Sequence, residues 1–276
     1  MDGLVPEHRH TEGLSVLLAD ALWNAMGWCP MEASIQYPVK YPDGDTRQKN
    51  PAGDGGPVAR RSARFMRMTW AVVILSWIAA FLILPHLPEV IPVHWDLNGG
   101  ANGFSDRLSG AFGIPAIITL ITILFIVLPR FDTMQVSLNA VRDIYAIIIF
   151  ATTALLFCME VIVLLVAAGL DLPLVSLSSV LIGFLFIVMG YLMPQISRNT
   201  TMGIRLPWTL KSEEIWKKTH DHGGPIFIAA GVLVVLGSLV AGVWAIAVML
   251  IIVTGASLYI VVWSYQLAQR KPTSEV

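Results

Sequence analysis

Residues 225–266 read PIFIAAGVLVVLGSLVAGVWAIAVMLIIVTGASLYIVVWSYQ and contain no charged side chain. A helix needs about 20 residues to cross roughly 30 Å of hydrocarbon, so this stretch is too long for a single crossing. Gly242 lies near its centre, and glycine is a residue at which helices readily end. The stretch therefore predicts a tight hairpin of two membrane spans.

The rest of the chain also has the composition of a membrane protein. Its 276 residues are 55% hydrophobic and only 13% charged, whereas soluble globular domains carry about a quarter charged residues. Four further apolar runs precede the hairpin, at residues 68–84, 111–128, 144–170 and 175–193. A buried helix of a soluble domain explains one such run, but not six in series. We therefore predict an all-α membrane protein with six transmembrane helices.

The orientation of these helices follows from the basic residues, because lysine and arginine near span ends stay on the cytoplasmic side. With six spans both termini lie on the same side of the membrane. If that side is the cytoplasm, only Arg107 lies on the outer side of the membrane body. The thirteen cytoplasmic basic residues are Arg60, Arg61, Arg64, Arg67, Arg130, Arg142, Arg198, Arg205, Lys211, Lys217, Lys218, Arg270 and Lys271. The predicted topology is N-in and C-in.

Several classes of function are disfavoured. Eighteen basic residues nearly cancel nineteen acidic ones, so the net charge of −1 provides no field for direct nucleic-acid binding. Cys29 and Cys158 are too few and too far apart for a thiol redox motif or a thiolate zinc site. We find no Ser/His/Asp constellation, phosphate-binding glycine loop or His-Glu-x-x-His pattern, and the two polar loops lie on opposite sides of the membrane. We therefore expect no enzyme, no cofactor and no metal.

The chain ahead of the first apolar run has a different composition. Residues 1–67 are rich in proline, glycine and charge, and such a segment cannot bury enough apolar surface to offset chain entropy. We expect a disordered N-terminal extension, in which residues 13–28 alone are apolar enough for a short amphipathic helix. The alternative is that translation starts at Met66 or Met68.

The membrane body divides into two parts. We assign residues 68–128 to a first helical hairpin with an extracytoplasmic loop at 85–110, and residues 129–276 to a four-helix region with a cytoplasmic loop at 194–224. Both loops are longer than turns require, so function is expected there.

The outer loop is expected to be compact. Three prolines between residues 85 and 92 favour an extended rise, and the Asn/Gly-rich segment 98–103 tolerates the positive φ of a tight turn. Four of its side chains are of metal-ligating types: His86, Glu89, His94 and Asp96. Their spacing matches no standard metal site, so we expect ordinary loop residues.

The inner loop predicts a short helix. Ser212 would be its N-cap, the acidic pair 213–214 its first turn, and the glycine pair 223–224 its stop. In one interpretation this helix lies on the membrane surface, with lysines at the headgroups and tryptophans at the interface. In the other, the loop is a cytoplasmic recognition surface that presents Arg205 and Trp208. The physical arguments leave both open.

The two loops also resemble known families. The run NTTMGIRLPWT at residues 199–209, with SEEIW at 212–216 and TH at 219–220, is similar to the signature of the SdpI/YfhL family. The outer loop resembles the small domain of unknown function that often precedes the SdpI region. The residues that carry this second resemblance are Pro88, Pro92, His94, Trp95, Gly99, Asn102, Gly103, Phe104 and Arg107. The resemblances cover about residues 68–266.

The first resemblance implies a multi-pass immunity protein of a bacterial-type cell membrane. Such a protein protects the producing cell from a secreted, membrane-active peptide toxin and, on sensing it, holds a transcriptional repressor at the membrane. The implied cytoplasmic partner surface comprises Asn199, Gly203, Ile204, Arg205, Pro207, Trp208, Thr209, Glu213, Glu214, Trp216 and His220. The implied outer contact comprises Pro88, Pro92, His94, Trp95, Gly99, Asn102, Gly103 and Arg107.

One acidic residue, Glu160, lies inside the third apolar run. An ionised carboxylate at the centre of a bilayer costs about 3 kcal/mol or more, so this side chain should face the bundle and be protonated or paired. We expect its partners to be hydroxyls of other spans, such as Ser176, Ser178 or Ser179. Glu160 is then either a structural acid or the central residue of a small-solute or ion transporter, which is the alternative function.

Overall fold

The computed structural model of the protein describes residues 57–96, 99–131 and 142–269. The helices in this part of the chain are α2 (Pro57–Ile83), α3 (Arg107–Val127), α5 (Arg142–Ala167), α6 (Leu174–Leu192), α7 (Pro207–Lys211), α8 (Glu213–Ala241) and α9 (Ala245–Gln269). Short 3-10 turns follow four of them: η1 (Leu84–His86), η2 (Leu128–Phe131), η3 (Met193–Gln195) and η4 (Gly242–Trp244). Strands β1 (Val90–Trp95) and β2 (Ala101–Asp106) form one antiparallel hairpin. The expected amphipathic segment at 13–28 lies outside the described residues.

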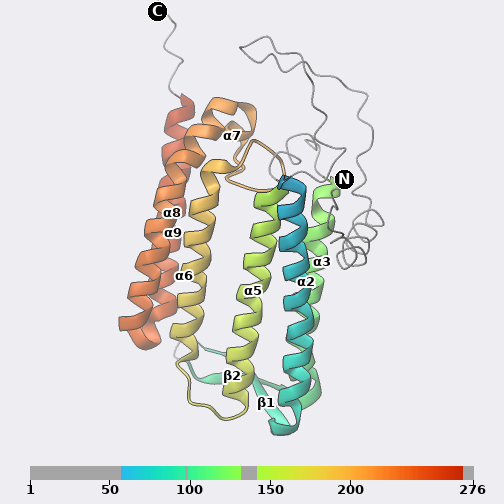
Figure 1. Ribbon diagram of the computed structural model, residues 1–276. Coiled ribbons are helices and arrows are strands. Elements are labelled where there is room, and N and C mark those ends of the chain that lie inside the picture. The colour runs from blue at the N-terminus through green and yellow to red at the C-terminus, as the bar shows by residue number, and fades with distance from the viewer. Residues whose placement is uncertain (1–56, 97–98, 132–141, 270–276) are drawn as a thin grey trace, which may run out of the picture.

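Five helical stretches among the described residues are long and apolar enough to cross a membrane. They are Arg61–His86, Arg107–Val127, Arg142–Ala167, Leu174–Gln195 and Glu213–Gln269. The last stretch turns at Gly242, whose φ of +52° ends α8. Helix α9 then packs back along α8 (Figure 1). The protein is therefore a helical membrane protein in which the residue expected to break the last apolar stretch does so.

Helices α2, α3 and α5 form one group (Figure 1). The buried residues of α2 recur every three or four positions, which is the spacing of a helix that presents one seam to a partner. They are Ser62, Met66, Thr69, Val73, Ser76 and Ala80. The partner helix, α5, runs parallel to α2, because the Phe65 and Phe150 rings meet with centroids 5.7 Å apart and Ser76 faces Glu160 further along.

This seam explains why the first membrane helix starts earlier than predicted. Helix α2 begins at Pro57 rather than near residue 68. Both Ser62 and Met66 are buried, so packing against α5 extends the helix beyond its apolar run. Residues 57–67 are helical, so the expectation of disorder is wrong for them, and the rest of the N-terminal extension lies outside the described residues.

Helices α6, α8 and α9 form the second group. Helices α6 and α8 are antiparallel and approach closely where Gly183 faces Gly231 and Gly190 faces Gly224. A Cβ atom on Gly231 would lie 2.5 Å from the Gly183 carbonyl oxygen, and one on Gly190 would lie 2.6 Å from the Gly224 carbonyl oxygen. Small residues of this kind let membrane helices pack backbone to backbone.

Helix α5 was expected in the same four-helix region as α6, but its buried face lies mainly against the first group. The Thr153 hydroxyl, for example, is hydrogen-bonded to the Thr122 hydroxyl of α3 at 3.2 Å. The reason is that the seam with α2 buries more of α5 than its contact with α6 does. Helices α6, α8 and α9 therefore form a group of their own, joined to α5 by a short connection at residues 168–173.

The loop between α2 and α3, expected from the sequence only as a compact loop, is a β-hairpin. Its turn is closed by the Asp96 N–H to the Gly100 carbonyl (2.9 Å) and has Gly99 at φ +84°. Its base is closed by the Arg107 N–H to the Glu89 carbonyl (2.9 Å). At the tip, a Cβ atom on Gly99 would lie 3.5 Å from Val175 of α6. The hairpin thus runs from α3 to the second helix group.

The short inner helix predicted to stop at Gly223 and Gly224 does not exist as such. Ser212 does cap a helix, since its hydroxyl accepts the Ile215 N–H at 3.3 Å, but that helix is α8 and continues to Ala241. Neither glycine has a positive φ. They lie where α8 meets η3, and a Cβ atom on Gly224 would lie 2.9 Å from Pro194. Close packing, and not helix termination, accounts for this pair.

Candidate functional site

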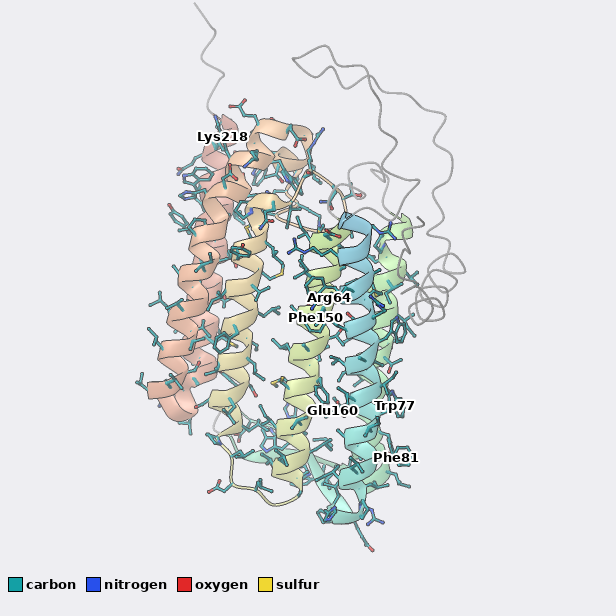
Figure 2. The ribbon with its side chains drawn as sticks, in the orientation of Figure 1. Arg64, Trp77, Phe81, Phe150, Glu160 and Lys218 are labelled. Carbon is teal, nitrogen blue, oxygen red and sulfur yellow. The ribbon has the colours of Figure 1, made fainter. Side chains whose placement is uncertain are left out.

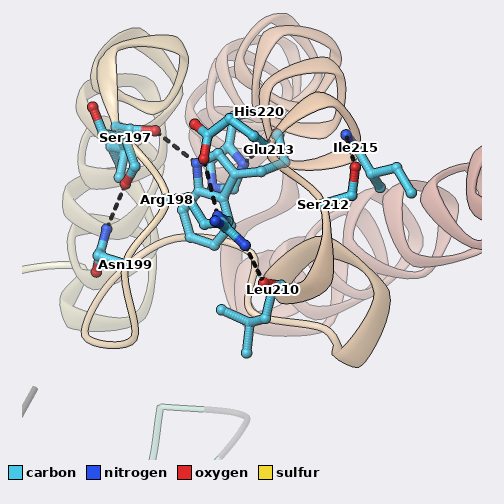
Figure 3. A network of polar contacts seen from close by, with 10 residues as sticks. Ser197, Arg198, Asn199, Leu210, Ser212, Glu213, Ile215 and His220 are labelled. Carbon is cyan, nitrogen blue, oxygen red and sulfur yellow. Dashed lines mark hydrogen bonds and ion pairs between the residues drawn. The ribbon is translucent and has the colours of Figure 1, made fainter. Parts of the chain in front are cut away.

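The loop between α6 and α8 is built around a buried turn at Asn199. This side chain has no exposed surface. Its Nδ2 donates to the Ser197 carbonyl at 2.8 Å (Figure 3). Its Oδ1 accepts the N–H groups of Thr201 (2.9 Å) and Met202 (2.8 Å). An asparagine side chain that bonds backbone on both sides fixes a turn. Asn199 therefore shapes the loop from within.

Gly203 and His220 meet directly behind this turn. The Ile204 N–H donates to His220 Nε2 at 3.0 Å, and Nδ1 lies 2.9 Å from the Trp216 carbonyl. Because Nε2 accepts, Nδ1 must carry the proton, so the imidazole is neutral. A Cβ atom on Gly203 would lie 2.5 Å from Nε2, and the φ of +102° there also requires glycine.

Trp216 fastens the start of α8 to the first helix group. Only 1% of it is exposed, its indole N–H donates to the Ile196 carbonyl (2.7 Å), and its ring stacks on His220 with centroids 4.2 Å apart. The buried cluster around it contains Met66, Ile126, Tyr145, Ile149, Ile196 and Met202. These residues come from α2, α3, α5 and the loop, so the loop joins the two helix groups at this end.

Helix α7 connects the loop to α9. The Thr209 hydroxyl is buried, donates to the Ile204 carbonyl (2.7 Å) and accepts the Leu206 N–H (2.8 Å). The Trp208 indole N–H donates to Ser264 Oγ on α9 (3.0 Å), and its ring meets Tyr265 edge to face. Helix α7 was not predicted from the sequence. Pro207 at its first position was the available signal, because proline is common at the first position of a helix.

The outer surface of the loop is charged. Arg198 spans it, pairing with Glu213 (2.9 Å) and donating to the Leu210 carbonyl (2.7 Å) (Figure 3). Arg205 is exposed and donates to the Thr200 carbonyl at 2.5 Å. Two more ion pairs along α8 join Lys217 to Asp221 and Lys218 to Glu214.

The motif residues thus fall into two sets. Asn199, Thr209, Trp216 and His220 are buried, so they can hold the loop but cannot themselves meet a partner. The exposed members are Gly203, Arg205, Pro207, Glu213 and Glu214, with Ile204 and Trp208 half-buried.

The outer site residues lie on or beside the hairpin. His94 Nδ1 and Asn102 Oδ1 are 2.6 Å apart, and Gly103 packs beneath His94, where a Cβ atom would approach its Cβ to 2.8 Å. Ile91 is fully buried against the helix ends, whereas Phe104 is 61% exposed. The hairpin therefore has an inner apolar face that packs on the bundle and an outer face that carries an exposed aromatic ring.

Asp106 has a structural role that was not predicted from the sequence. Its carboxylate accepts the Ser109 N–H (3.0 Å) and the Leu108 N–H (3.1 Å), and so caps α3. The Ser109 backbone and hydroxyl, followed by the Leu108 backbone, lower the pKa of Asp106. An aspartate just before an apolar run was the available signal. No group of three or more His, Cys, Asp or Glu side chains among the described residues could hold a metal ion.

Glu160 is buried at the seam between α5 and α2, in the half of α5 nearer the hairpin (Figure 2). The expected partners on α6 are wrong. Ser178 and Ser179 donate to carbonyls of their own helix, and Ser176 donates to the Gly242 carbonyl. The polar group that faces Glu160 is Ser76 of α2, although neither carboxylate oxygen has a hydrogen-bond partner among the described residues.

These features define a multi-pass helical membrane protein with an ordered polar loop at one end and a hairpin at the other. The model of the SdpI/YfhL protein family matches residues 195–264, and that of a domain of unknown function, DUF1648, matches residues 71–119. The chain carries an SdpI/YfhL family region with a DUF1648 region upstream, so the resemblance in its motifs is confirmed.

A curated relative extends this result. The immunity protein SdpI of Bacillus subtilis (strain 168) is 25% identical over 185 residues, which are 66% of this chain and 85% of that protein. No solved structure matches the chain. The relationship is distant and covers most of the membrane body.

Proposed function

We propose that this protein is an immunity protein that protects its cell membrane from a membrane-active peptide toxin. The observation that supports the proposal most directly is the cytoplasmic loop. Its family motif is divided into buried residues that hold the loop, such as Asn199 and His220, and exposed residues such as Arg205. Holding a loop in one conformation costs backbone entropy. A loop that is ordered in this way is suited to present a fixed surface to a partner.

In this proposal the chain crosses the membrane six times, with both ends in the cytoplasm. Helices α8 and α9 count as separate crossings because Gly242 divides the last apolar stretch. The loop at 195–212 is then cytoplasmic, and the hairpin at 90–106 is extracytoplasmic. The excess of lysine and arginine on the loop side supports this orientation.

The hairpin is the proposed outer contact and the loop the proposed inner one. The exposed Phe104 ring offers an apolar anchor to a peptide at the membrane surface. The exposed Arg205 offers charge to a cytoplasmic partner, for which a transcriptional repressor is the candidate. The proposed role involves no catalysis.

The test is to express the protein in a toxin-sensitive host and to challenge it with the peptide products encoded near its gene. We expect cells with the wild-type protein to survive at least one of these peptides. The Phe104→Ser variant should lower survival. The control is Leu170→Ser, which also replaces an exposed apolar side chain on the proposed outer side by serine and should leave survival unchanged. Unchanged sensitivity to every peptide would contradict the immunity role.

The cytoplasmic role is tested separately with Arg205→Ala. This variant should keep protection but lose recruitment of a tagged repressor encoded nearby to the membrane. Lys211→Ala, which removes another exposed charge from the same loop, is the control. Equal recruitment by Arg205→Ala and the wild type would remove Arg205 from the partner surface.

The second candidate function is transport of a small solute or ion. It is favoured by one observation, the burial of Glu160 with no hydrogen-bond partner in residues 57–96, 99–131 and 142–269. It predicts an uptake activity in proteoliposomes that Glu160→Gln abolishes. Protection from a toxin with no such uptake would support the first function over the second.

A further inference from the structure

The α2–α5 seam contains two polar side chains that face each other and are shielded from solvent. Glu160 and Ser76 both have no exposed surface. Neither carboxylate oxygen of Glu160 nor the Ser76 hydroxyl has a hydrogen-bond partner in the part of the chain that the structure describes. Buried polar atoms without partners are costly, so such a pair requires a chemical explanation.

No cation in the surrounding helices compensates a carboxylate at this position. The apolar part of α2 after Arg67, all of α3 after Arg107 and all of α6 contain no lysine, arginine or histidine. Arg67 precedes Ser76 by nine residues, or about 13 Å of helix. The other titratable groups toward this end are His86, Glu89, His94, Asp96, Asp106, Arg107 and Asp171. They lie in η1, in the hairpin or in the connections, except Arg107, which is the first residue of α3. An ionised Glu160 would cost several kcal/mol.

The site is closed toward the hairpin by apolar side chains. Glu160 lies seven residues before the end of α5 at Ala167, about 10 Å along the helix. A buried cluster covers that end, made of Leu87, Ile91, Ala111, Leu164 and Ala167. This cover excludes a hydrated ion but not a proton, which needs only brief contact with water to exchange.

We propose that Glu160 and Ser76 form a proton-binding site, in which the carboxyl holds one proton and donates it as a hydrogen bond to Ser76 Oγ. The Ser76 hydroxyl is then free to donate to a carbonyl of its own helix, as the Thr69 hydroxyl does one heptad earlier toward Phe65 (3.0 Å). Binding converts a carboxylate and a proton into a neutral acid, so no other reactant is needed. This inference does not rest on the immunity role.

The experiment is infrared spectroscopy of the full chain reconstituted in lipid vesicles at neutral pH. The wild-type protein should show the C=O band of a protonated carboxyl group, equivalent to one acid per chain. Glu160→Gln should lose the whole band, because its amide has the shape of the acid but no carboxyl. Glu89→Gln, which changes an exposed glutamate beside the hairpin, should keep it.

The second variant removes the proposed acceptor. Ser76→Ala should keep the acid but shift its C=O band to higher frequency, since the carboxyl then lacks its hydrogen-bond partner. This comparison with the wild type remains decisive even if Glu160→Gln does not fold. Absence of the band at neutral pH, or its disappearance on raising the pH above about 4.3, where exposed glutamates ionise, would overturn the proposal.

The apolar cover gives a third measurement. Transfer into D2O should shift the acid band slowly in the wild type, and Leu164→Gly should speed this exchange at least tenfold by opening the cover. Leu120→Gly, at an exposed position of α3, should leave the exchange rate unchanged. Exchange in the wild type as fast as for exposed carboxyl groups would show that no closed site exists.

Discussion

The two helix groups pack in different ways. In the first, α2 and α5 meet through side chains, and several of these are hydroxyls or the Glu160 carboxyl. In the second, α6 and α8 meet through backbone, with two pairs of glycines in contact. Lipid offers no hydrophobic drive between membrane helices, so close packing and interhelical polar contacts are the available sources of association. The comparison indicates that the first group relies mainly on side-chain packing with polar contacts, and the second mainly on close backbone packing at glycines.

The glycine seam should tolerate substitution least. Gly231→Leu would place a Cβ atom 2.5 Å from the Gly183 carbonyl oxygen and 2.7 Å from Ile187 Cγ1. Backbone cannot move aside as a flexible side chain can, so we expect a loss of about 3 kcal/mol or failure to fold. Denaturant unfolding of the purified protein in detergent micelles measures this.

Gly255→Leu on α9 is the matched control, because nothing lies within 4 Å of the position of its Cβ atom. It should change stability by less than about 0.5 kcal/mol. If both variants were equally stable, the close approach of α6 and α8 would not be what holds the second group together.

The loop between α6 and α8 joins the groups, and its buried Asn199 should be the next most sensitive position. Asn199→Ala removes the side-chain oxygen that accepts the N–H groups of Thr201 and Met202, at a cost of about 2 kcal/mol. Hydrogen exchange of these two amides should accelerate at the same time. Ser197→Ala, which changes an exposed side chain and keeps the carbonyl that Asn199 uses, should behave like the wild type.

The sequence predicted more of the spans than of their packing. Apolar runs depend on local composition, and each expected run lies mostly within a long helix, with the break at Gly242 as expected. The packing of α5 on α2 depends on contacts between residues far apart in the chain, and no single run reveals it. Gly223 and Gly224 were misinterpreted because a glycine that ends a helix and one that permits close packing look alike in sequence.

The candidate site shows the same limit. The motif around Arg205 was recognised, but its division into buried and exposed residues required the fold. The hairpin was seen only as a tight turn, because Pro92 interrupts the alternating pattern of Val90–Trp95, and a proline demotes a strand in sequence reasoning. Pro92 is accommodated here because it lies beside an irregularity in a two-stranded sheet whose outer edges are unpaired.

The polar seam of the first group should contribute less per contact than the glycine seam. The Thr122 and Thr153 hydroxyls are 3.2 Å apart and buried. A double-mutant cycle with Thr122→Val and Thr153→Val should give a coupling energy of about 0.6 kcal/mol, typical for membrane proteins. A coupling of several kcal/mol would reverse the comparison and make hydroxyl contacts the main source of stability in this group.

The smallest effect is expected at the hairpin, where Asp106 caps α3 from a solvent-exposed position. Hydrogen bonds from Ser109 and then Leu108 lower the pKa of Asp106 in the folded protein. A carboxylate with a lowered pKa stabilises the fold at any pH above its unfolded value, near 3.8, and that contribution disappears as the pH falls through the folded value. The Leu108 and Ser109 amides should therefore become less protected from hydrogen exchange below about pH 4, once the intrinsic pH dependence of exchange is removed.

Asp106→Asn keeps a capping oxygen but cannot titrate. This variant should abolish the pH dependence and retain most of the protection at neutral pH. Acid sensitivity that persists in Asp106→Asn would place the responsible group elsewhere and leave the cap as a pH-independent feature of the hairpin.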